Sequence, residues 1–472
     1  MMASAIAFGT EGWRGVMADD FTTANVRIVA QAMADHLKAR GGRRGPVAIG
    51  WDSRFLSDTF ARTVAEVLAG NGLRVVLSAG VVPTCAVSRY VVAKRLPAGV
   101  MVTASHNPAV YNGIKVKEAF GGSATTETVA SIERRLGRAP VKRLAFEEAT
   151  AARRVRPADF LPPFLAGIRS SLDLASIRRR RFRVVVDSMF GAGGRLIERV
   201  VAGGRCRIDT LHGEPDPRFG GRAPEPIAAN LAELMTTVRR ARADLGIATD
   251  GDADRLGIIG PGGAWLNPGQ VLCVLLMHLV TVRRQTGAVV KTVSNTMLIN
   301  RLTQALGLRL IEVPVGFKHI AKLMLEQDVV IGGEESGGIG VAGYLPERDG
   351  IFNGLLVLEA IAASGRSLSA LVGDLERRFG RFWYGRRDLQ LRMAQVDGLF
   401  RRLAEAPPQD LAGVAVARVN TMDGVKLIGR DDSWLLFRRS GTEPIVRIYA
   451  ETPRRSRLPR LLRLGVRLAE GR

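Results

Sequence analysis

Short apolar runs alternate along the chain with longer stretches in which apolar residues recur every three or four positions. The short runs predict β-strands, and the longer stretches predict amphipathic helices. The predicted strands fall at 46–50, 74–77, 99–102, 182–186, 244–248, 288–293 and 328–331. Such alternation is typical of α/β domains.

The pattern changes after residue 380. Predicted strands at 388–391, 434–437 and 445–450 lie closer together and are followed by a helical stretch, which predicts an α+β unit. At about 150 residues per domain, a chain of 472 residues is expected to hold about three domains. The pattern itself divides into four units, at 1–157, 158–262, 263–380 and 381–472.

Four polar loops, each directly after a predicted strand, contain the residues best suited to chemistry. They are ASHNP (104–108), TDGDADR (249–255), GGEESGG (332–338) and RRSGTEP (438–444). Ligands of α/β domains collect beyond the carboxyl ends of the strands, and clefts between domains are common small-molecule sites. We therefore expect these loops to meet in one cleft.

The TDGDADR loop carries three aspartates at alternate positions, Asp250, Asp252 and Asp254. Carboxylates this close repel one another unless a cation neutralises them, and oxygen-only ligation favours Mg²⁺ or another hard divalent ion. The neighbouring Arg255 can meet a phosphate or orient a carboxylate. The alternative is a solvated acidic turn.

The ASHNP loop offers Ser105 as a nucleophile or a phosphate carrier, with His106 next to it. Neighbours along the chain seldom pair as nucleophile and base, and no G-x-S-x-G motif surrounds this serine, which argues against a serine hydrolase. Asn107 and Pro108 predict a sharp turn that holds the hydroxyl at the loop tip. The alternative is an ordinary Asx-type turn.

The remaining loops fit the recognition of a phosphorylated, hydroxyl-rich ligand. A guanidinium, two hydroxyls and an approachable backbone suit a phosphate dianion, and RRSGTEP provides them as Arg438, Ser440, Gly441 and Thr442. GTEGWRG (9–15) can bring Arg14 into a cleft on a glycine-rich frame. In GGEESGG, Glu334 and Ser336 can bind sugar hydroxyls. The alternatives are a polar hairpin loop and a glycine-rich turn.

The basic residues bear on two questions: which groups could do acid–base chemistry, and whether nucleic acid is a partner. The net charge is +23, and only nine of the 68 basic residues are lysine. Lys115, Lys117 and Lys318 are therefore candidates for acid–base chemistry, because lysine can lose a proton where arginine cannot. Arginine is spread along the whole chain, so we attribute the charge to composition and do not expect nucleic acid as a partner.

Nothing in the composition indicates a membrane protein or a disulfide scaffold. The longest apolar stretch, 271–282, is interrupted by His278 and is too short to span a bilayer. We see no signal peptide. The three cysteines are far apart in the sequence, so we expect no disulfides and a cytoplasmic protein.

Taken together, the sequence resembles the α-D-phosphohexomutase family, nearest its phosphoglucomutase/phosphomannomutase group. The resemblance covers nearly the whole chain and its motifs occur in the expected order. It rests on GTEGWRG (9–15), GWDSR (50–54), GVVPT (80–84), TASHNP (103–108), NGIKVK (112–117), DPRFGGRAPEP (216–226), TDGDADR (249–255), VPVGFK (313–318), GEESGG (333–338), PERDG (346–350) and RRSGTEPIVRIYAE (438–451).

The resemblance implies three related α/β domains and a C-terminal α+β domain with an antiparallel sheet, arranged around a central cleft. It implies that Ser105 carries a phosphoryl group, that Mg²⁺ is held by a phosphoserine oxygen with Asp250, Asp252 and Asp254, and that a hexose 1,6-bisphosphate is the intermediate and activator. Lys115, Arg14 and His106 would be catalytic. The substrate-binding residues would be Arg255, Lys318, Glu334, Ser336, Arg438, Ser440, Gly441, Thr442 and Arg447.

Two positions depart from the family pattern. Many relatives have histidine where this chain has Gly338, and others have histidine at the position of Phe317. The second acid–base group is therefore open, with Lys318, His319 and Arg348 as candidates. These variants favour glucose as the sugar, with mannose possible and glucosamine less favoured. We expect a phosphosugar substrate and a monomer or homodimer; a Mg²⁺-dependent sugar phosphatase and a polyanion-binding protein are the alternatives.

Overall fold

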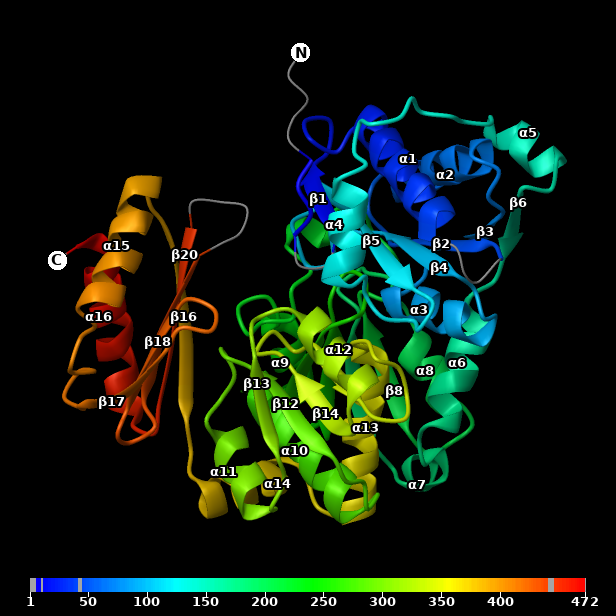
Figure 1. The fold of residues 1–472 in the computed structure, drawn as a ribbon. Coiled ribbons are helices and arrows are strands. Elements are labelled where there is room, and N and C mark those ends of the chain that lie inside the picture. Colours follow the sequence, from blue (N-terminus) through cyan, green and yellow to red (C-terminus); the bar gives the residue numbers. More distant parts are fainter. Residues whose placement is uncertain (1–5, 10–11, 41–44, 440–444, 472) are drawn as a thin grey trace.

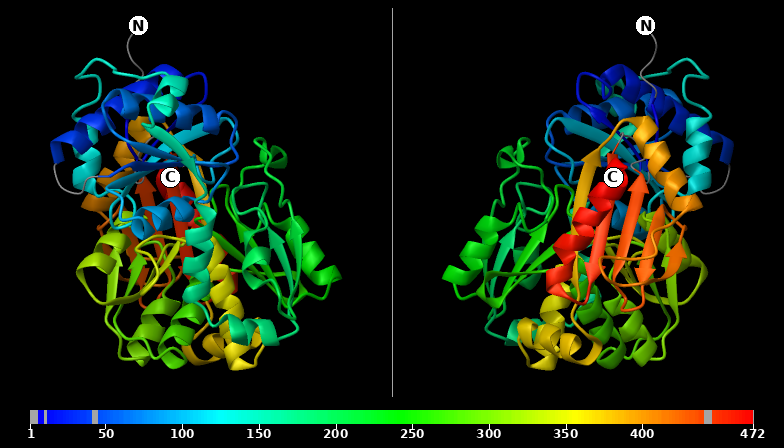
Figure 2. Two further views of the ribbon diagram at one scale, coloured as in Figure 1. Left: turned by 90° about the vertical axis from the view of Figure 1, so that its right-hand side faces the viewer. Right: turned by 90° about the vertical axis from the view of Figure 1, so that its left-hand side faces the viewer.

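The structure is a computed structural model that describes residues 6–9, 12–40, 45–439 and 445–471. Four β-sheets with flanking helices succeed one another along the chain (Figure 1). Three of them lie side by side, and the fourth, with its two helices, forms a separate lobe at one end of the molecule (Figures 1 and 2). The expected architecture of three α/β units and one antiparallel unit is confirmed.

The first unit has a six-stranded sheet in the order β1-β5-β4-β2-β3-β6. Strands β2, β3, β4 and β6 are parallel, and β5 runs antiparallel to both β4 and β1. Its elements are β1 (Trp13–Val16), α1 (Thr23–Arg40), β2 (Val47–Trp51), α2 (Ser57–Gly70), β3 (Val75–Ser78), α3 (Thr84–Ala93), β4 (Ala98–Val102), β5 (Tyr111–Glu118), α4 (Thr126–Glu133), α5 (Phe146–Ala151) and β6 (Val155–Ala158).

The second unit has a five-stranded sheet in the order β11-β10-β9-β7-β8. Strands β8, β7 and β9 are parallel, whereas β10 and β11 continue as antiparallel strands. Its elements are α6 (Leu161–Ser170), α7 (Leu174–Arg179), β7 (Arg183–Asp187), α8 (Leu196–Val201), β8 (Arg207–Leu211), α9 (Ala232–Arg240), β9 (Leu245–Thr249), β10 (Leu256–Gly260) and β11 (Ala264–Leu266).

The third unit has a four-stranded sheet in the order β13-β12-β14-β15, with only β15 antiparallel. Its elements are α10 (Pro268–Thr281), β12 (Ala288–Thr292), α11 (Leu298–Ala305), β13 (Leu310–Val313), α12 (Phe317–Glu326), β14 (Val329–Gly333), β15 (Ile339–Val341), α13 (Gly350–Ser364) and α14 (Leu368–Phe379). Among the described residues, no single helix is both long and apolar enough to cross a membrane.

The fourth unit has an entirely antiparallel sheet in the order β16-β20-β19-β18-β17. Helices α15 and α16 accompany it and form the outer side of the lobe (Figure 1). Its elements are β16 (Trp383–Gln390), α15 (Met393–Glu405), β17 (Val416–Asn420), β18 (Val425–Gly429), β19 (Trp434–Arg439), β20 (Ile445–Thr452) and α16 (Leu458–Glu470).

Two strands cross the unit boundaries that the sequence predicts. Strand β6 ends at Ala158, one residue beyond 157, and β11 pairs with β10 although it lies beyond 262. A short glycine-rich turn at 261–263 separates β10 from β11, and the sequence pattern reads this turn as the end of the unit. The second sheet therefore extends to Leu266.

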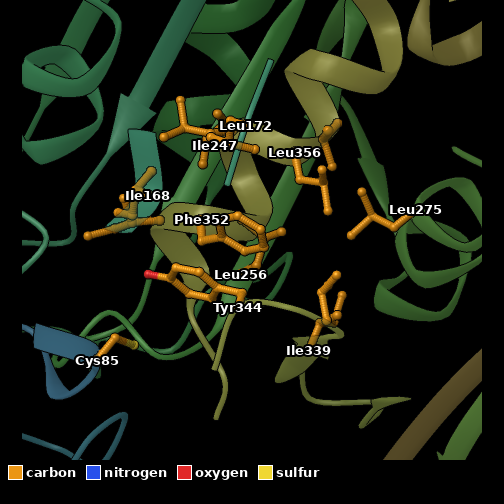
Figure 3. Packing of buried hydrophobic residues seen from close by; sticks show 14 of the residues in the cluster. Cys85, Ile168, Leu172, Ile247, Leu256, Leu275, Ile339, Tyr344, Phe352 and Leu356 are labelled. Atoms are coloured by element: carbon orange, nitrogen blue, oxygen red, sulfur yellow. The ribbon is translucent and has the colours of Figure 1, made fainter. Parts of the chain in front are cut away.

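One continuous hydrophobic core joins the first three units. Its buried side chains come from α3, β7, β9, α10 and α13, and Figure 3 shows Cys85, Ile247, Leu275, Tyr344 and Phe352 within it. The fourth unit has its own core, and a smaller cluster that includes Val293, Met297, Trp434 and Tyr449 joins it to the third. The three cysteines are free thiols.

Candidate active site

Each of the four chemical loops connects two consecutive antiparallel strands. ASHNP joins β4 to β5, TDGDADR joins β9 to β10, GGEESGG joins β14 to β15, and RRSGTEP joins β19 to β20. In the first three units the strand before the loop also belongs to the parallel part of its sheet. The loops of the first three units therefore occupy equivalent places.

Ser105 lies at the tip of its loop in a left-handed conformation, with φ of 55°. Its side chain is fully buried, its N–H donates to Thr103 Oγ1 at 2.8 Å, and its hydroxyl donates to Asp250 Oδ2 at 2.8 Å. A left-handed conformation is uncommon for a residue with a Cβ atom and persists only where the surroundings hold it. The serine hydroxyl is thus directed at the aspartate loop of the second unit.

A buried arginine that the sequence reasoning did not single out holds this loop. The Arg54 guanidinium donates to the carbonyl oxygens of Ser105 at 2.7 Å, Asn107 at 2.6 Å, Pro108 at 2.8 Å and Tyr111 at 3.0 Å. Asp52 lies 3.2 Å from its Nε. The sequence feature that could have indicated Arg54 is the GWDSR motif (50–54), in which an acidic and a basic residue directly follow a buried strand.

The three aspartates converge as their spacing predicts. One carboxylate oxygen from each of Asp250, Asp252 and Asp254 lies within 4.8 Å of the others, and all three side chains are fully buried. Burial and the neighbouring charges of Asp252 and Asp254 raise the pKa of Asp250 well above its usual value. Among the described atoms, Asp252 Oδ1 and Asp254 Oδ1 are buried without a hydrogen-bond partner. Such a set of oxygens fits a hard divalent cation.

Three further side chains bind the aspartates. Lys115 Nζ donates to Asp252 Oδ2 at 2.6 Å and to Asp254 Oδ2 at 2.7 Å. Thr84 Oγ1 donates to Asp252 Oδ2 at 2.5 Å, and an Arg348 Nη donates to Asp254 Oδ2 at 2.6 Å. Burial alone would raise the pKa of Asp254, but Arg348 and Lys115 outweigh it and hold that pKa well below the usual value.

The predicted sugar-binding loop lies against the same cluster. Glu334 Oε2 accepts from Arg348 at 3.0 Å, and its Oε1 accepts from the Gly316 N–H at 3.2 Å. Ser336 is half-buried two residues further along the same loop. Lys318 lies near the start of α12, two residues after Gly316. The structure thus brings Glu334 to the aspartates through Arg348.

Arg14, His106 and Arg255 lie in or near the serine loop. Arg14 donates to Asn107 Oδ1 at 2.7 Å, and the Arg255 N–H donates to Asp250 Oδ1 at 3.0 Å. His106 Nδ1 lies 3.5 Å from Ser105 Oγ, at the long limit of a hydrogen bond. Burial, with the nearby charges of Arg255 and Arg14, lowers the pKa of His106 well below its usual value.

On the fourth unit, Arg438 and Arg447 lie directly opposite each other on β19 and β20. Like charges in that position repel, and an anion between them would relieve the repulsion. Asp423 accepts from Arg438 at 2.7 Å and Asp388 lies 3.9 Å from Arg447. Ser440, Gly441 and Thr442, the other residues predicted to bind phosphate, lie outside the described residues.

The candidates for the second acid–base group are in different surroundings. Arg348 is buried between two carboxylates and, as an arginine, cannot donate a proton usefully. Lys318 and His319 lie at the start of α12, where burial and the charge of Lys318 lower the pKa of His319.

Comparison with known proteins places the chain in a family. Residues 5–140, 162–263 and 267–379 match the family models described as phosphoglucomutase/phosphomannomutase, alpha/beta/alpha domains I, II and III. A phosphoglucomutase/phosphomannomutase of Thermococcus kodakarensis is 31% identical, over 98% of both chains. The chain belongs to the phosphoglucomutase/phosphomannomutase family. Its membership of the α-D-phosphohexomutases, expected from the motifs, is thereby confirmed.

Other relatives of this phosphohexomutase differ in the sugar that they are named for. A probable phosphoglucosamine mutase of Methanothermobacter thermautotrophicus is 33% identical, over 94% of this chain and 93% of its own. A putative phosphomannomutase from Thermus thermophilus, known from a crystal structure, is 38% identical in sequence, and the two structures superpose with a TM-score of 0.88 over the full length of both chains. The family is therefore shared, whereas the sugar differs among the relatives.

Proposed function

We propose that this phosphohexomutase interconverts hexose 1-phosphate and hexose 6-phosphate through a phosphoserine at Ser105 and a hexose 1,6-bisphosphate. The observation that carries the proposal is the contact of 2.8 Å between Ser105 Oγ and Asp250 Oδ2, which joins residues 145 positions apart. A serine buried against three carboxylates that fit Mg²⁺ is suited to phosphoryl transfer.

In this reaction the bond between phosphorus and Ser105 Oγ breaks and a bond from phosphorus to the free sugar hydroxyl forms. When bound at the aspartates, Mg²⁺ would offset the charge on the transferring group. Lys115, whose ammonium donates to Asp252 and Asp254, is our candidate for acid–base work; it would have to be neutral when it accepts the hydroxyl proton, and it would return that proton in the reverse step. After the bisphosphate reorients, its other phosphoryl group returns to Ser105.

The remaining residues bind the substrate in either orientation. Glu334 and Ser336 would contact sugar hydroxyls, while Arg438 and Arg447, with 440–442, would bind the phosphate that does not react. Arg14 and His106 would act in catalysis beside Ser105, and Arg255 and Lys318 would bind the substrate. We propose glucose as the preferred sugar with mannose possible, a cytoplasmic location, and a monomer or homodimer.

The test is the production of hexose 6-phosphate from the 1-phosphates of glucose, mannose and glucosamine, with Mg²⁺ and a trace of bisphosphate. Glucose 1-phosphate should react fastest. Ser105→Ala should lose nearly all turnover and remain folded, whereas the exposed control Ser456→Ala should keep the wild-type rate. A Ser105→Ala variant as fast as wild type would refute the phosphoserine, and a faster mannose reaction would refute the sugar preference.

A sugar phosphatase with the same residues would instead release inorganic phosphate. A mutase must keep water from the phosphoserine while the sugar is bound, whereas a phosphatase must admit water to it. We expect free phosphate to appear far more slowly than the isomer. Equal rates of phosphate release and isomerisation would favour the phosphatase.

A further inference from the structure

Gly338, the last residue of the sugar-binding loop GGEESGG, makes room for a buried arginine. A Cβ atom at this position would lie 2.2 Å from Cδ of Arg348 and 3.0 Å from Oε2 of Glu334. The first of these distances is far inside van der Waals contact. Gly338 is not among the residues with positive φ. Lack of space, and not backbone conformation, therefore excludes a side chain here.

Arg348 contacts all three α/β units. Its guanidinium donates to Asp254 of the second unit at 2.6 Å and to Glu334 of the third at 3.0 Å. Its carbonyl oxygen accepts from Cys85 Sγ of the first unit at 2.8 Å. The neighbouring Glu347 forms a buried ion pair with Lys117 of β5. Arg348 is only 2% exposed. Its backbone is thus held by the first unit, and its guanidinium binds both the second and the third.

The two loops that Arg348 joins are also packed backbone to backbone. The Leu256 N–H donates to the Gly337 carbonyl at 3.1 Å, and the Gly350 N–H donates to the Ala253 carbonyl at 3.0 Å. A Cβ atom at Gly337 would lie 2.3 Å from the Leu256 carbonyl oxygen. These contacts hold the two backbones together, and the guanidinium bridges the side chains of Asp254 and Glu334 that project from them.

We propose that Arg348 is a positioning residue that couples the metal-binding aspartates to the sugar-binding Glu334, and that Gly338 exists to give it room. The coupling rests on the proposed function, since it concerns the same metal and sugar sites. Its physical basis is the planar fork of arginine, which can hold two carboxylates at a fixed separation, whereas the single ammonium of lysine cannot.

Two substitutions of Arg348 separate its geometry from its charge. Arg348→Lys keeps the charge and loses the fork, so we expect about tenfold weaker binding of Mg²⁺, a typical loss for a residue that orients a metal ligand. We also expect a raised KM for the hexose phosphate, with a smaller change in kcat. Mg²⁺ binding is measured by calorimetry on metal-free protein of known phosphorylation state, with the exposed Arg377→Lys as control.

Other outcomes would overturn the coupling. If Arg348 acts only through its charge, Arg348→Lys will bind Mg²⁺ like wild type, and Arg348→Met will bind it more tightly because a competing cation is gone. If its role is only structural, both variants will lower Tm and the active fraction while KM and Mg²⁺ affinity stay unchanged.

Gly338 provides an independent test. Gly338→Ala should displace Arg348 and reproduce the effects of Arg348→Lys, whereas Gly373→Ala in α14, where the nearest atom is a flexible arginine tip at 3.6 Å, should change nothing. Arg348→Ala removes the shortest contact of the added methyl, the one with Arg348 Cδ, so Gly338→Ala/Arg348→Ala should be little worse than Arg348→Ala alone. Additive losses in the double variant would show that Gly338 does not act through Arg348.

The two proposals can fail separately. An inactive wild-type protein would remove the proposed function, but the effect of Arg348 on Mg²⁺ affinity would still be measurable. Normal mutase activity with unchanged Mg²⁺ affinity and KM in Arg348→Lys would leave the function intact and remove the coupling.

Discussion

The shape of the serine loop depends on Arg54. Arg54→Met would leave the buried Asp52 carboxylate without its cation and four carbonyl oxygens without their donor. Removing one partner of a buried ion pair costs about 3–5 kcal/mol of unfolding free energy. Denaturant unfolding should show this loss, and the exposed Arg74→Met should stay within about 0.5 kcal/mol of wild type.

Asp349, at the N-terminus of α13, should make stability depend on pH. Burial raises its pKa to about 7 in the folded protein, although the Phe352 N–H and the Tyr344 hydroxyl both donate to it. Between its unfolded value of 3.8 and about 7 the folded state holds the extra proton, so its contribution to stability falls as pH rises through this range.

Asp349→Asn should remove this pH dependence. The variant should match wild type near pH 4 and be the more stable above pH 7, by at most about 4 kcal/mol for a shift of about three pKa units. Thermal unfolding from pH 4 to pH 8 measures the difference. A gap that does not widen with rising pH would contradict a raised pKa.

The residues found from the sequence are those whose chemistry is local. Asp250, Asp252 and Asp254 stand at alternate positions, so their convergence needs only one loop. Arg54 and Thr84 instead bind groups that only the fold brings near. The Thr84 hydroxyl, for example, donates to Asp252, which is 168 positions away in the sequence. Hydrophobic periodicity and residue spacing cannot predict a contact over that distance. The residues next to Arg54 and Thr84 in the sequence predict only an ordinary turn and a helix N-terminus.

At the scale of elements, the sequence predicts the inner parallel strands of the three α/β units, but not their parallel edge strands β6, β8 and β13 or their antiparallel strands. Strands such as β4 and β9 are continuous apolar runs because both their faces are buried. Strand β5 is also buried, but it carries three charged residues, Lys115, Lys117 and Glu118. The two lysines pair with carboxylates of the second and third units, and Glu118 pairs with an arginine of the first unit. From the sequence alone, these charges suggest an exposed segment, because their oppositely charged partners come close only in the folded protein.

Helices α10 and α13 are held together by a buried carboxylate. Glu359 accepts from His278 at 2.8 Å, from Arg283 at 2.6 Å and from the Asp173 N–H at 2.8 Å. Burial would raise its pKa, but the hydrogen bonds from His278 and Arg283 lower it to about 2. Its contribution to stability is therefore present above pH 4.5 and is lost as pH falls towards 2.

We expect Glu359→Gln to lower the unfolding free energy by about 3 kcal/mol at pH 7, which corresponds to a pKa shift of about 2.5 units. The difference from wild type should narrow as pH falls below 4.5. Chemical unfolding at pH 7 and pH 3 tests this. A loss of the same size at both pH values would mean that packing, and not charge, accounts for the effect.

At the scale of the whole molecule, the charge of +23 is the feature that the proposed function explains least. A positive field attracts phosphosugars, and it also attracts nucleic acids without any built site. We expect DNA retention to disappear by about 0.2 M salt, as non-specific binding does. Filter binding across a salt series tests this, and retention that persists with a steep slope would favour the polyanion-binding alternative.

The contact between Ser105 and Asp250 also bears on how a ribosome delivers this protein. When the first unit emerges, the hydroxyl at 105 and the amine of Lys115 exist, but the carboxylates that meet them are still about 145 codons away. A nascent chain therefore contains the serine before it contains the carboxylates that the proposed reaction needs.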